Sequence, residues 1–361
     1  MDSPPLPLEL LAPGCDAPEV YCSGDFDEWR PETRGLALAR VAPGLYRGEA
    51  LWGASATRYK FHLGSWDGGE LTAWGARAPN RVYPGDGRAI RAVVPQFLRD
   101  GRYHDDRYRP RIERLPADLP LPAPFATRRI AALLPHDYER SGRDYPVLYL
   151  QDGQNLFDEF APYGNWELDR RLAWLAERGC GEFIVVAIDH ADDKRIAEYT
   201  PPSSTARVER GTADAYGRFL VRDLKPLVDR TYRTLPAREH TAVGGSSMGA
   251  LASLHVAMSE SATFGAAMVL SPSIWVDPGL VDRWPERPDG ATRVYLHGGM
   301  RESERTTETF ARLDAALRAV RGPRRRIHLR THFAPEAEHN EQAWGEAFPR
   351  AAAFFFGGAC P

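Results

Sequence analysis

The segment Gly245–Gly249 reads Gly-Ser-Ser-Met-Gly and places Ser247 at the centre of a Gly-x-Ser-x-Gly pattern. This pattern is typical of a tight strand-to-helix turn that exposes one serine hydroxyl as a nucleophile. Glycine is needed at both positions, because the turn brings backbone segments so close together that a Cβ would clash. The apolar Thr241–Val243 before the motif and the helix-forming Ala250–Met258 after it supply the expected context. We therefore expect Ser247 to carry out acyl transfer.

A nucleophilic serine needs a general base, and in such folds the base follows the serine and the acid along the chain. His255 lies in the middle of an expected helix, and His328 and His332 belong to an expected strand over Arg326–His332. His339 follows that strand in a polar loop, from which it can reach a serine at the edge of the sheet. We expect His339 to take the proton from the serine, although a loop histidine can also be merely solvated.

The acid is expected in the loop that follows the strand Val294–Leu296, which starts at His297. A carboxylate there can accept a hydrogen bond from the imidazole and hold its tautomer. Glu302 is the better placed residue, and Glu304 is the alternative. Either one could instead be an N-terminal charge that favours the next helix through its dipole.

An oxyanion hole needs two backbone N–H groups that point at the developing negative charge. Met248 supplies one by its position after the nucleophile, and Gln154 is expected to supply the other. Gln154 lies in an Asp-Gly loop directly after the strand Pro146–Leu150. The same loop could be an ordinary turn.

Several polar and aromatic residues lie near the expected strand ends and are candidates for substrate binding. The segment Asp189–Asp193 combines three carboxylates with one histidine, but carboxylates at strand ends are more often solvated than bound to a metal. We expect neither a metal nor a cofactor. The tryptophans could form apolar walls for an acyl or aryl group or belong to the core. The substrate-binding candidates are Asp152, Asn155, Trp166, Asp189, His190, Glu198 and Trp275.

After Phe125 the chain alternates between short apolar runs and longer amphipathic stretches. This alternation predicts an α/β fold, a mostly parallel sheet with helices on both faces, over residues 125–361. The expected buried strands, besides those named above, include Phe183–Ile188 and Ala267–Leu270. The expected crossover helices are Trp166–Arg178, Ala215–Tyr232 and Thr307–Val320, and a further helix begins near Glu341.

The first part of the chain has a different pattern. Short β-type runs, among them Glu19–Cys22, Leu45–Leu51 and Thr57–Phe61, are separated by turn residues. They predict a small antiparallel β-sandwich over residues 1–95. Residues 96–124 are rich in Arg, Asp and Pro without an apolar period, and we expect a linker there.

Composition bounds the class of protein. A length of 361 residues predicts two domains, and 43% hydrophobic and 26% charged residues are those of an ordinary globular protein. The net charge of −3 gives no reason to expect nucleic acid, and no apolar run of about 18 residues predicts a membrane span. A monomer or a homodimer is expected.

The four cysteines and the N-terminus bear on the compartment. Cys15, Cys22, Cys180 and Cys360 lack metal-ligand spacing, so zinc is not expected. Cys15 and Cys22 are expected to be free thiols, with pairing across a hairpin as the alternative. No secretory signal is visible, which favours a cytoplasmic location unless a signal has been removed.

Five segments together resemble one known family, the putative esterases, which include esterase D-like, feruloyl and enterochelin esterases and mycolyltransferases. They are residues 150–158 (LQDGQNLFD), 198–201 (EYTP), 244–249 (GGSSMG), 270–275 (LSPSIW) and 338–344 (EHNEQAW). The resemblance covers about residues 125–357. It implies an α/β-hydrolase fold with Ser247 as nucleophile, His339 as base, Glu302 as acid, and Gln154 and Met248 at the oxyanion hole. The position of His297 is often Asp in relatives, so this chain departs from the family's pattern in the loop that is expected to carry the acid.

The N-terminal part is similar to starch- and glycogen-binding modules, which have an immunoglobulin-like sandwich fold. The marks are residues 24–29 (GDFDEW), 59–61 (YKF), 64–66 (GSW) and 79–81 (PNR). This likeness implies sugar contacts by Lys60, Trp66, Trp74 and Asn80, although Trp74 and Asn80 lie further apart than is usual. The alternative is a sandwich that packs on the hydrolase and walls its cleft.

The expected function is therefore a serine esterase that forms an acyl-enzyme intermediate on an acylated sugar, a feruloyl-type ester or another bulky ester. Three alternatives stay open. The first is a siderophore trilactone esterase, and the second is an acyltransferase with the same triad. The third is a glycan-binding protein with an inactive hydrolase domain, against which the intact triad argues.

Overall fold

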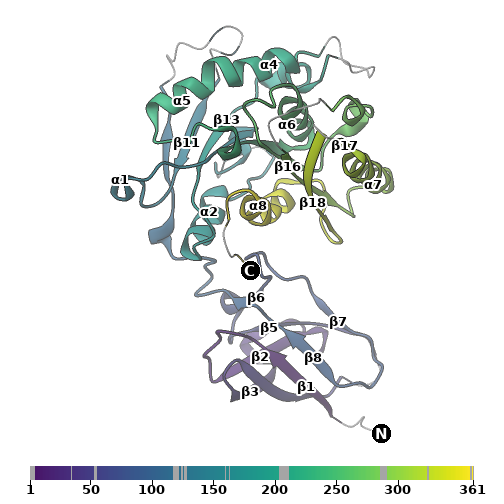
Figure 1. Cartoon of the computed structure of the whole chain (residues 1–361). Coiled ribbons are helices and arrows are strands. Elements are labelled where there is room, and N and C mark those ends of the chain that lie inside the picture. Colours follow the sequence, from purple (N-terminus) through teal and green to yellow (C-terminus); the bar gives the residue numbers. More distant parts are fainter. Residues whose placement is uncertain are drawn as a thin grey trace. The chain divides into compact units, whose positions relative to one another are not determined.

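The computed structural model describes residues 5–33, 35–52, 55–116, 122, 125, 128–158, 160–161, 163–202, 211–284, 291–322, 325–357 and 360. The chain divides into two compact units, Met1–Asp105 and Asp106–Cys360 (Figure 1). Each unit has its own cluster of buried apolar side chains.

The larger unit is built on a mixed sheet whose central strands are parallel. Its strands are, in order across the sheet, β10 (Arg111–Arg114), β11 (Ile130–Leu134), β13 (Ile184–Ile188), β12 (Val147–Gln151), β14 (Thr241–Ser246), β15 (Ala266–Leu270), β16 (Thr292–Gly299), β18 (Arg325–Ala334) and β17 (Arg321–Gly322). From β13 to β18 each neighbouring pair is parallel, whereas β10, β11 and β17 pair antiparallel. The strands β11 to β15 are buried throughout, as expected for a sheet covered on both faces.

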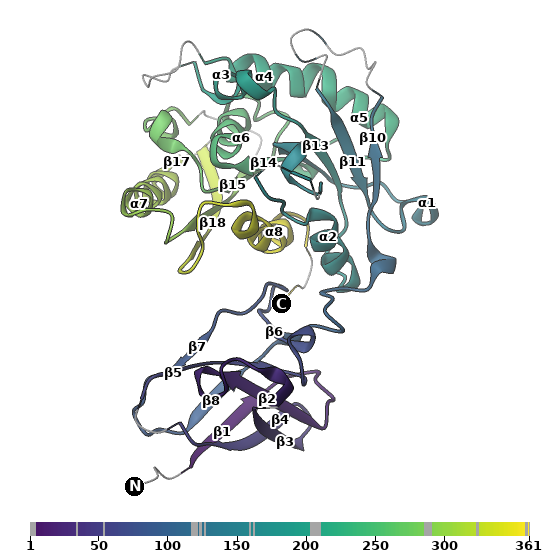
Figure 2. The same cartoon turned by 180° about the vertical axis from the view of Figure 1, so that it is seen from behind.

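Helices cover both faces of this sheet. The helices are α1 (Tyr138–Ser141), α2 (Leu168–Glu177), α3 (Arg195–Tyr199), α4 (Ala213–Phe219), α5 (Lys225–Thr231), α6 (Ser247–Ser259), α7 (Glu304–Ala319) and α8 (Glu341–Phe356). Helices α2 and α8 pack beside each other on one face, and α4 packs beside α6 on the other (Figure 2). The predicted alternation of strands and helices is confirmed, and it brings the carboxyl ends of the parallel strands to one edge.

The helix expected over Ala215–Tyr232 is interrupted. A π-helical segment, Leu220–Leu224, lies between α4 and α5. Pro226 follows directly in the first turn of α5. Because proline has no N–H to donate to the preceding turn, it accounts for the wider winding at this point.

The smaller unit is built mainly of strands, which agrees in part with the predicted antiparallel sandwich. Its seven main strands are, in order, β7 (Arg81–Tyr83), β5 (Thr57–His62), β2 (Glu19–Gly24), β3 (Leu36–Ala42), β4 (Leu45–Ala50), β1 (Leu6–Leu11) and β8 (Ile90–Val93). Hydrogen bonds join them in one continuous sheet, in which β1 and β8 are parallel and the other neighbours antiparallel. Tyr83 of β7 and Ile90 of β8 belong to the same buried cluster, so the two edges of the sheet share one core.

The segment 96–124, expected as a linker, contains two strands in its described part. Strand β9 (Gln96–Phe97) pairs with β6 (Glu70–Leu71), and β10 forms the edge of the larger sheet. The boundary between the compact units lies at residues 105 and 106. Strand β10 has no apolar period because it is an exposed edge strand rich in charge, and this is why the sequence pattern suggested a linker.

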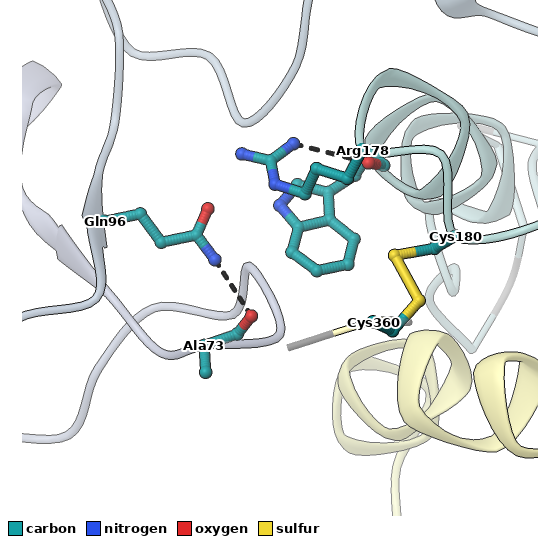
Figure 3. The surroundings of a disulfide bond; sticks show 6 residues. Ala73, Gln96, Arg178, Cys180 and Cys360 are labelled. Atoms are coloured by element: carbon teal, nitrogen blue, oxygen red, sulfur yellow. Dashed lines mark hydrogen bonds between the residues drawn. A yellow bond between two sulfur atoms is a disulfide. The ribbon is translucent and has the colours of Figure 1, made fainter. Parts of the chain in front are cut away.

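One disulfide joins two distant points of the larger unit. Cys180 follows α2 and Cys360 follows α8, and their Cα atoms are 5.4 Å apart (Figure 3). Because α2 and α8 pack together, the fold brings these cysteines close although they are 180 residues apart in sequence. Cys15 and Cys22 are free, as expected. Among the described residues, no helix combines the length and the apolar character that crossing a membrane requires.

Candidate active site

Ser247 lies at the turn between β14 and α6 in a conformation that L-residues rarely adopt. Its φ angle is 54°, in the left-handed region. A Cβ on Gly245 would lie 2.9 Å from the carbonyl carbon of Gly249, and a Cβ on Gly249 would lie 2.8 Å from Oδ2 of Asp152. Two glycines are therefore needed for the turn to close and to present the serine at the strand end.

Ser247, His339 and Glu302 form one hydrogen-bonded chain. His339 Nε2 lies 3.0 Å from Ser247 Oγ, and His339 Nδ1 lies 2.7 Å from Glu302 Oε2. His339 is in the loop between β18 and α8, and Glu302 is in the turn between β16 and α7. The side chain of Glu302 is 2% exposed, whereas that of His339 is 43% exposed. The carboxylate is thus buried behind an imidazole that substrate can reach.

Glu302 is held by further hydrogen bonds. Oε1 accepts from Ser271 Oγ at 2.5 Å and from the Gly299 N–H at 2.8 Å. Trp344 Nε1 in turn donates to Ser271 Oγ at 2.9 Å, and its ring packs edge-on against His339. Burial alone would raise the pKa of Glu302, but the hydrogen bonds from His339, Ser271 and Gly299 lower it overall, so the carboxylate stays charged.

The second glutamate considered for this role, Glu304, starts α7. Its side chain lies outside the described residues. The hydrogen bond to His339 Nδ1 is made by Glu302, the residue preferred from the sequence.

Ser273 is a close neighbour of Ser247 that sequence reasoning did not single out. Its Oγ lies 3.2 Å from Ser247 Oγ, and its N–H donates to the Ser247 carbonyl at 3.0 Å. Ser271 and Ser273 both follow the end of β15, next to the strand that carries the nucleophile. The segment LSPSIW contributes to the family resemblance, but its sequence alone assigns no role to these two serines.

The two expected oxyanion donors lie in the turns that follow two neighbouring strands, β12 and β14. Gln154 is in the 3₁₀ turn Gly153–Asn155 directly after β12, and Met248 is in the first turn of α6. The first N–H groups of a helix have no acceptor within it and carry partial positive charge. Asp152 between β12 and the 3₁₀ turn has a φ angle of 58°, which sets the direction of that turn.

The hydroxyl of Ser247 opens into a pocket of about 740 Å³. Besides the serine and His339 it is lined by Asp152, Gln154, Asn155, His190 and further residues: Arg129, Tyr163, Asp192, Arg195, Ile196, Ser246, Glu341 and Trp344. A second cavity of about 230 Å³ shares Arg129 and Gln154 with it. Three expected binding residues, Asp152, Asn155 and His190, therefore line the pocket.

The polar groups of this pocket are mostly engaged with each other. Both carboxylate oxygens of Asp152 accept from Arg195, at 2.7 and 2.8 Å. Asn155 Nδ2 donates to Glu341 at 3.2 Å. The His190 N–H donates to Gln154 Oε1 at 3.1 Å. These contacts make a preorganised wall around the candidate oxyanion turn.

Four of the expected binding residues do not line this pocket. Trp166 is 2% exposed and packs against Trp344, so it belongs to the core. Glu198 is buried in an ion pair with Arg128 at 2.6 Å. Asp189 lines the second cavity and pairs with Arg129. Trp275 is 65% exposed in the 3₁₀ turn after Ser273. Position after a strand end did not reveal which way each side chain points.

His297 was expected at the start of a loop, but the structure places it within β16. Its Nδ1 lies 3.3 Å from Nδ1 of His332 on the neighbouring β18. Burial, aided by the charge of the other histidine, lowers the pKa of His297 to about 3. Burial and the charge of Arg350 lower the pKa of His332 to about 4. Both rings are therefore neutral near pH 7, and His297 Nε2 is buried without a partner among the described residues.

This pair predicts acid destabilisation. The folded-state pKa values lie below the unfolded value of about 6.5, so the unfolded state binds protons that the folded state does not. The contribution of the two neutral histidines to the free energy of unfolding is complete above about pH 6.5. It falls as the pH drops towards about 4, by up to about 1.4 kcal/mol per pH unit for each ring. Urea unfolding at pH 7, 6 and 5 measures how steeply the free energy of unfolding changes with pH. The His332→Gln variant is expected to have a smaller slope. An unchanged slope in that variant would contradict the assignment.

The expected sugar contacts lie in the smaller unit. Lys60, Trp66 and Trp74 are half-buried and Asn80 is exposed. The Trp66 indole N–H donates to the Trp29 carbonyl at 3.3 Å, and its ring packs on His62 and Trp29. These contacts give Trp66 a packing role, and sugar binding by this unit stays a prediction.

One group of metal-type ligands is found among the described residues. It consists of His136, Asp137 and Glu182, whose ligand atoms lie within 4.8 Å of one another. Arg143 donates to both carboxylates, at 2.9 and 2.6 Å, so part of their negative charge is already compensated. The cluster therefore reads as an ion-pair network.

Comparison with known proteins agrees with the geometry. A protein-family model described as "Putative esterase" matches residues 125–355. A siderophore triacetylfusarinine C esterase of Aspergillus fumigatus is 33% identical over 138 residues, which are 36% of this chain and 44% of the relative. The ferri-bacillibactin esterase BesA of Bacillus subtilis is 26% identical over 156 residues, 38% and 52% of the two chains. The chain spans between 32% and 58% of the length of the curated relatives that it matches.

Solved structures share the fold. The BES protein of Bacillus cereus superposes with a TM-score of 0.54 at 18% identity and covers 68% of this chain and 94% of its own. The enterobactin esterase FES of Shigella flexneri, solved in the presence of 2,3-di-hydroxy-N-benzoyl-glycine, has a TM-score of 0.50 at 15% identity. It covers 93% of this chain and 87% of its own, so its likeness extends into both compact units.

Proposed function

The chain belongs to the putative-esterase family, and on that premise we propose that it cleaves carboxylic esters through an acyl-enzyme intermediate. The observation that carries the proposal is the hydrogen-bonded path from Ser247 through His339 to Glu302. His339 Nε2 takes the proton while Ser247 Oγ attacks the ester carbonyl carbon, and the imidazolium then protonates the leaving alkoxide. Water repeats both steps on the acyl-enzyme, which releases the carboxylic acid and restores the serine.

Glu302 has the role of orienting the base. It accepts from His339 Nδ1, so Nε2 is left free to accept the proton of Ser247. Its buried negative charge also stabilises the imidazolium that forms during each half-reaction. The tetrahedral oxyanion is held by the N–H groups of Met248 and Gln154, where the positive end of α6 adds to the field.

Hydrolysis fits the site better than acyl transfer to a sugar. The side chain of His339 is 43% exposed. It lies at the wall of a pocket of about 740 Å³, so water can reach an acyl group on Ser247. A transferase needs a drier cleft to protect its intermediate from water. The complete triad also argues against a glycan-binding protein with an inactive hydrolase domain.

For the substrate we propose a bulky siderophore-type ester, and a feruloyl-type or sugar ester as second candidate. Relatives at 26% and 33% identity are named as siderophore esterases. The likeness to a ferulic acid esterase has 16% identity and concerns the fold alone. The pocket shares Gln154 and Arg129 with a second cavity, so a large substrate has space on both sides of these two residues.

A substrate panel tests this proposal. We expect kcat/KM for a cyclic trilactone siderophore to exceed that for methyl ferulate and for 4-nitrophenyl acetate by at least about tenfold, because only a bulky ester fills both cavities. Initial rates at equal enzyme concentration measure this, and each substrate is also run with the Ser247→Ala variant as a blank. A preference for methyl ferulate would favour the second candidate, and turnover that is equal in the blank would exclude the serine mechanism.

Location and assembly stay open to proposal. The sequence favours a cytoplasmic location, and one observation favours the alternative, an exported protein. Disulfides such as Cys180–Cys360 persist mainly in oxidising compartments. We therefore propose an exported protein, and the monomer or homodimer expected from the sequence stays a prediction.

A further inference from the structure

Asp152 was expected to contact substrate, but its carboxylate is fully engaged by Arg195. Nε of Arg195 donates to Oδ1 at 2.7 Å and Nη2 donates to Oδ2 at 2.8 Å, which is the two-point geometry that arginine and carboxylate favour. The side chain of Asp152 is 6% exposed and that of Arg195 is 23% exposed. Arg195 begins α3, far along the chain from β12, so the pair ties two loops at the strand ends together.

The carboxylate of Asp152 lies beside both proposed oxyanion donors. It is two residues before Gln154 in a left-handed conformation that directs the 3₁₀ turn. Its Oδ2 would lie 2.8 Å from a Cβ on Gly249, which places it against the first turn of α6, where Met248 also lies. A negative charge at this point repels the negative charge that develops on the substrate oxygen and so destabilises the transition state.

The field of Asp152 reaches the pocket. Glu341 lines the same pocket, and its pKa is raised by burial first and by the charge of Asp152 as a further cause. Arg195 and His339 act on Glu341 in the opposite direction. The pocket is thus sensitive to whether the charge of Asp152 is balanced.

We propose that Arg195 is a positioning residue of the oxyanion hole: it pins the turn that carries Gln154 through Asp152 and cancels the charge of that carboxylate. The inference rests on the proposed function and adds a requirement to it. The two hydrogen bonds from Arg195 hold the left-handed Asp152 more rigidly than water would. Without the arginine, the same aspartate becomes an uncompensated charge beside the oxyanion.

The test is a charge-rescue experiment on the full chain. Arg195→Gln is expected to lower kcat by roughly 30- to 100-fold with a smaller change in KM, because the charge acts on the transition state rather than on the neutral ester. Asp152→Asn combined with Arg195→Gln is expected to regain at least about tenfold in kcat over Arg195→Gln. Arg195→Lys, which keeps the charge but loses the fork, is expected to lie between wild type and Arg195→Gln.

A matched control separates this effect from loss of a buried ion pair. Arg81 pairs with Glu70 in the smaller unit at similar burial, 27% and 0% exposed, also through Nε and Nη2. Arg81→Gln should lower the unfolding temperature but leave kcat unchanged. Unfolding temperatures of all variants show which of them are folded at the assay temperature.

The outcomes are distinct. Rescue in the double variant supports the inference, and a double variant that is as slow as Arg195→Gln or slower overturns it, because a purely structural pair gives no rescue. If Arg195→Gln does not fold, the same comparison is made with Arg195→Lys, for which kcat equal to wild type overturns the inference. If the wild type neither hydrolyses esters nor labels with a fluorophosphonate at Ser247, the proposed function itself fails.

Discussion

Replacing Ser247 with alanine is expected to lower kcat/KM for ester hydrolysis by roughly 10⁴- to 10⁶-fold, the range found when the nucleophile of a serine triad is removed. The reason is that no acyl-enzyme can form without Oγ, and only the oxyanion donors and substrate binding remain to assist direct attack by water. The fold should persist, because among the described residues the serine hydroxyl hydrogen-bonds only to His339 and Ser273, and it faces an open pocket.

Initial rates and labelling with a fluorophosphonate probe measure this effect together. Ser246→Ala is the matched control, since Ser246 precedes the nucleophile, lines the same pocket and is not part of the hydrogen-bonded chain. It should keep its label and retain activity within about tenfold of wild type. Labelling of Ser247→Ala, together with loss of label in Ser246→Ala, would show that the wrong serine was assigned.

Replacing His339 with alanine is expected to be nearly as severe, with a loss of roughly 10³- to 10⁵-fold in kcat/KM. Nothing else within hydrogen-bond distance of Ser247 Oγ can act as a base among the described residues, because its other partner there is the hydroxyl of Ser273. The triad acts as one unit, so most of the loss should appear in kcat. Steady-state rates and the fluorophosphonate labelling rate should fall together.

Two further variants test the order of the chain. Glu302→Ala should be milder than His339→Ala, because the imidazole remains and loses only its orienting partner. His297→Ala is expected to lower stability, since it empties a buried site, while the activity of the folded fraction is retained. If His297→Ala proves more damaging to kcat than His339→Ala, with stability accounted for, then His339 is not the base.

Much of the site could be predicted because the fold imposes an order on it. Parallel strands joined by crossover helices place all their carboxyl ends at one edge. The serine after β14, the acid after β16 and the histidine after β18 must therefore meet there, however far apart they are in sequence. A histidine within a strand, such as His332, is excluded by the same rule. Chain order and strand ends predicted Ser247 and His339 and left Glu302 and Glu304 as the candidate acids, and the structure brings Glu302 into hydrogen-bond distance of His339.

The direction of a side chain was beyond the reach of that rule. Trp166, Glu198 and Asp152 all lie near strand ends, yet Trp166 is in the core, Glu198 is paired with Arg128, and Asp152 is held by Arg195. Whether a residue at a strand end faces the pocket or its neighbour depends on one or two backbone angles and on the partner across the gap. The local sequence pattern predicts neither these backbone angles nor the partner residue.

The sequence by itself determined the alternation of strands and helices and a start rich in strands, and it predicted the reacting groups and their order, with Glu304 left as the alternative acid. These follow from periodicity and from short motifs with glycines at turn positions where a Cβ would clash. Only the tertiary structure decided the contacts between distant segments. The Cys180–Cys360 disulfide, the Ser271 and Trp344 bonds behind Glu302, and the Arg195–Asp152 pair all join elements that are remote in the chain. The physical reason is that such pairs depend on which helices pack together and which strands are neighbours, and packing depends on the whole chain rather than on any one segment.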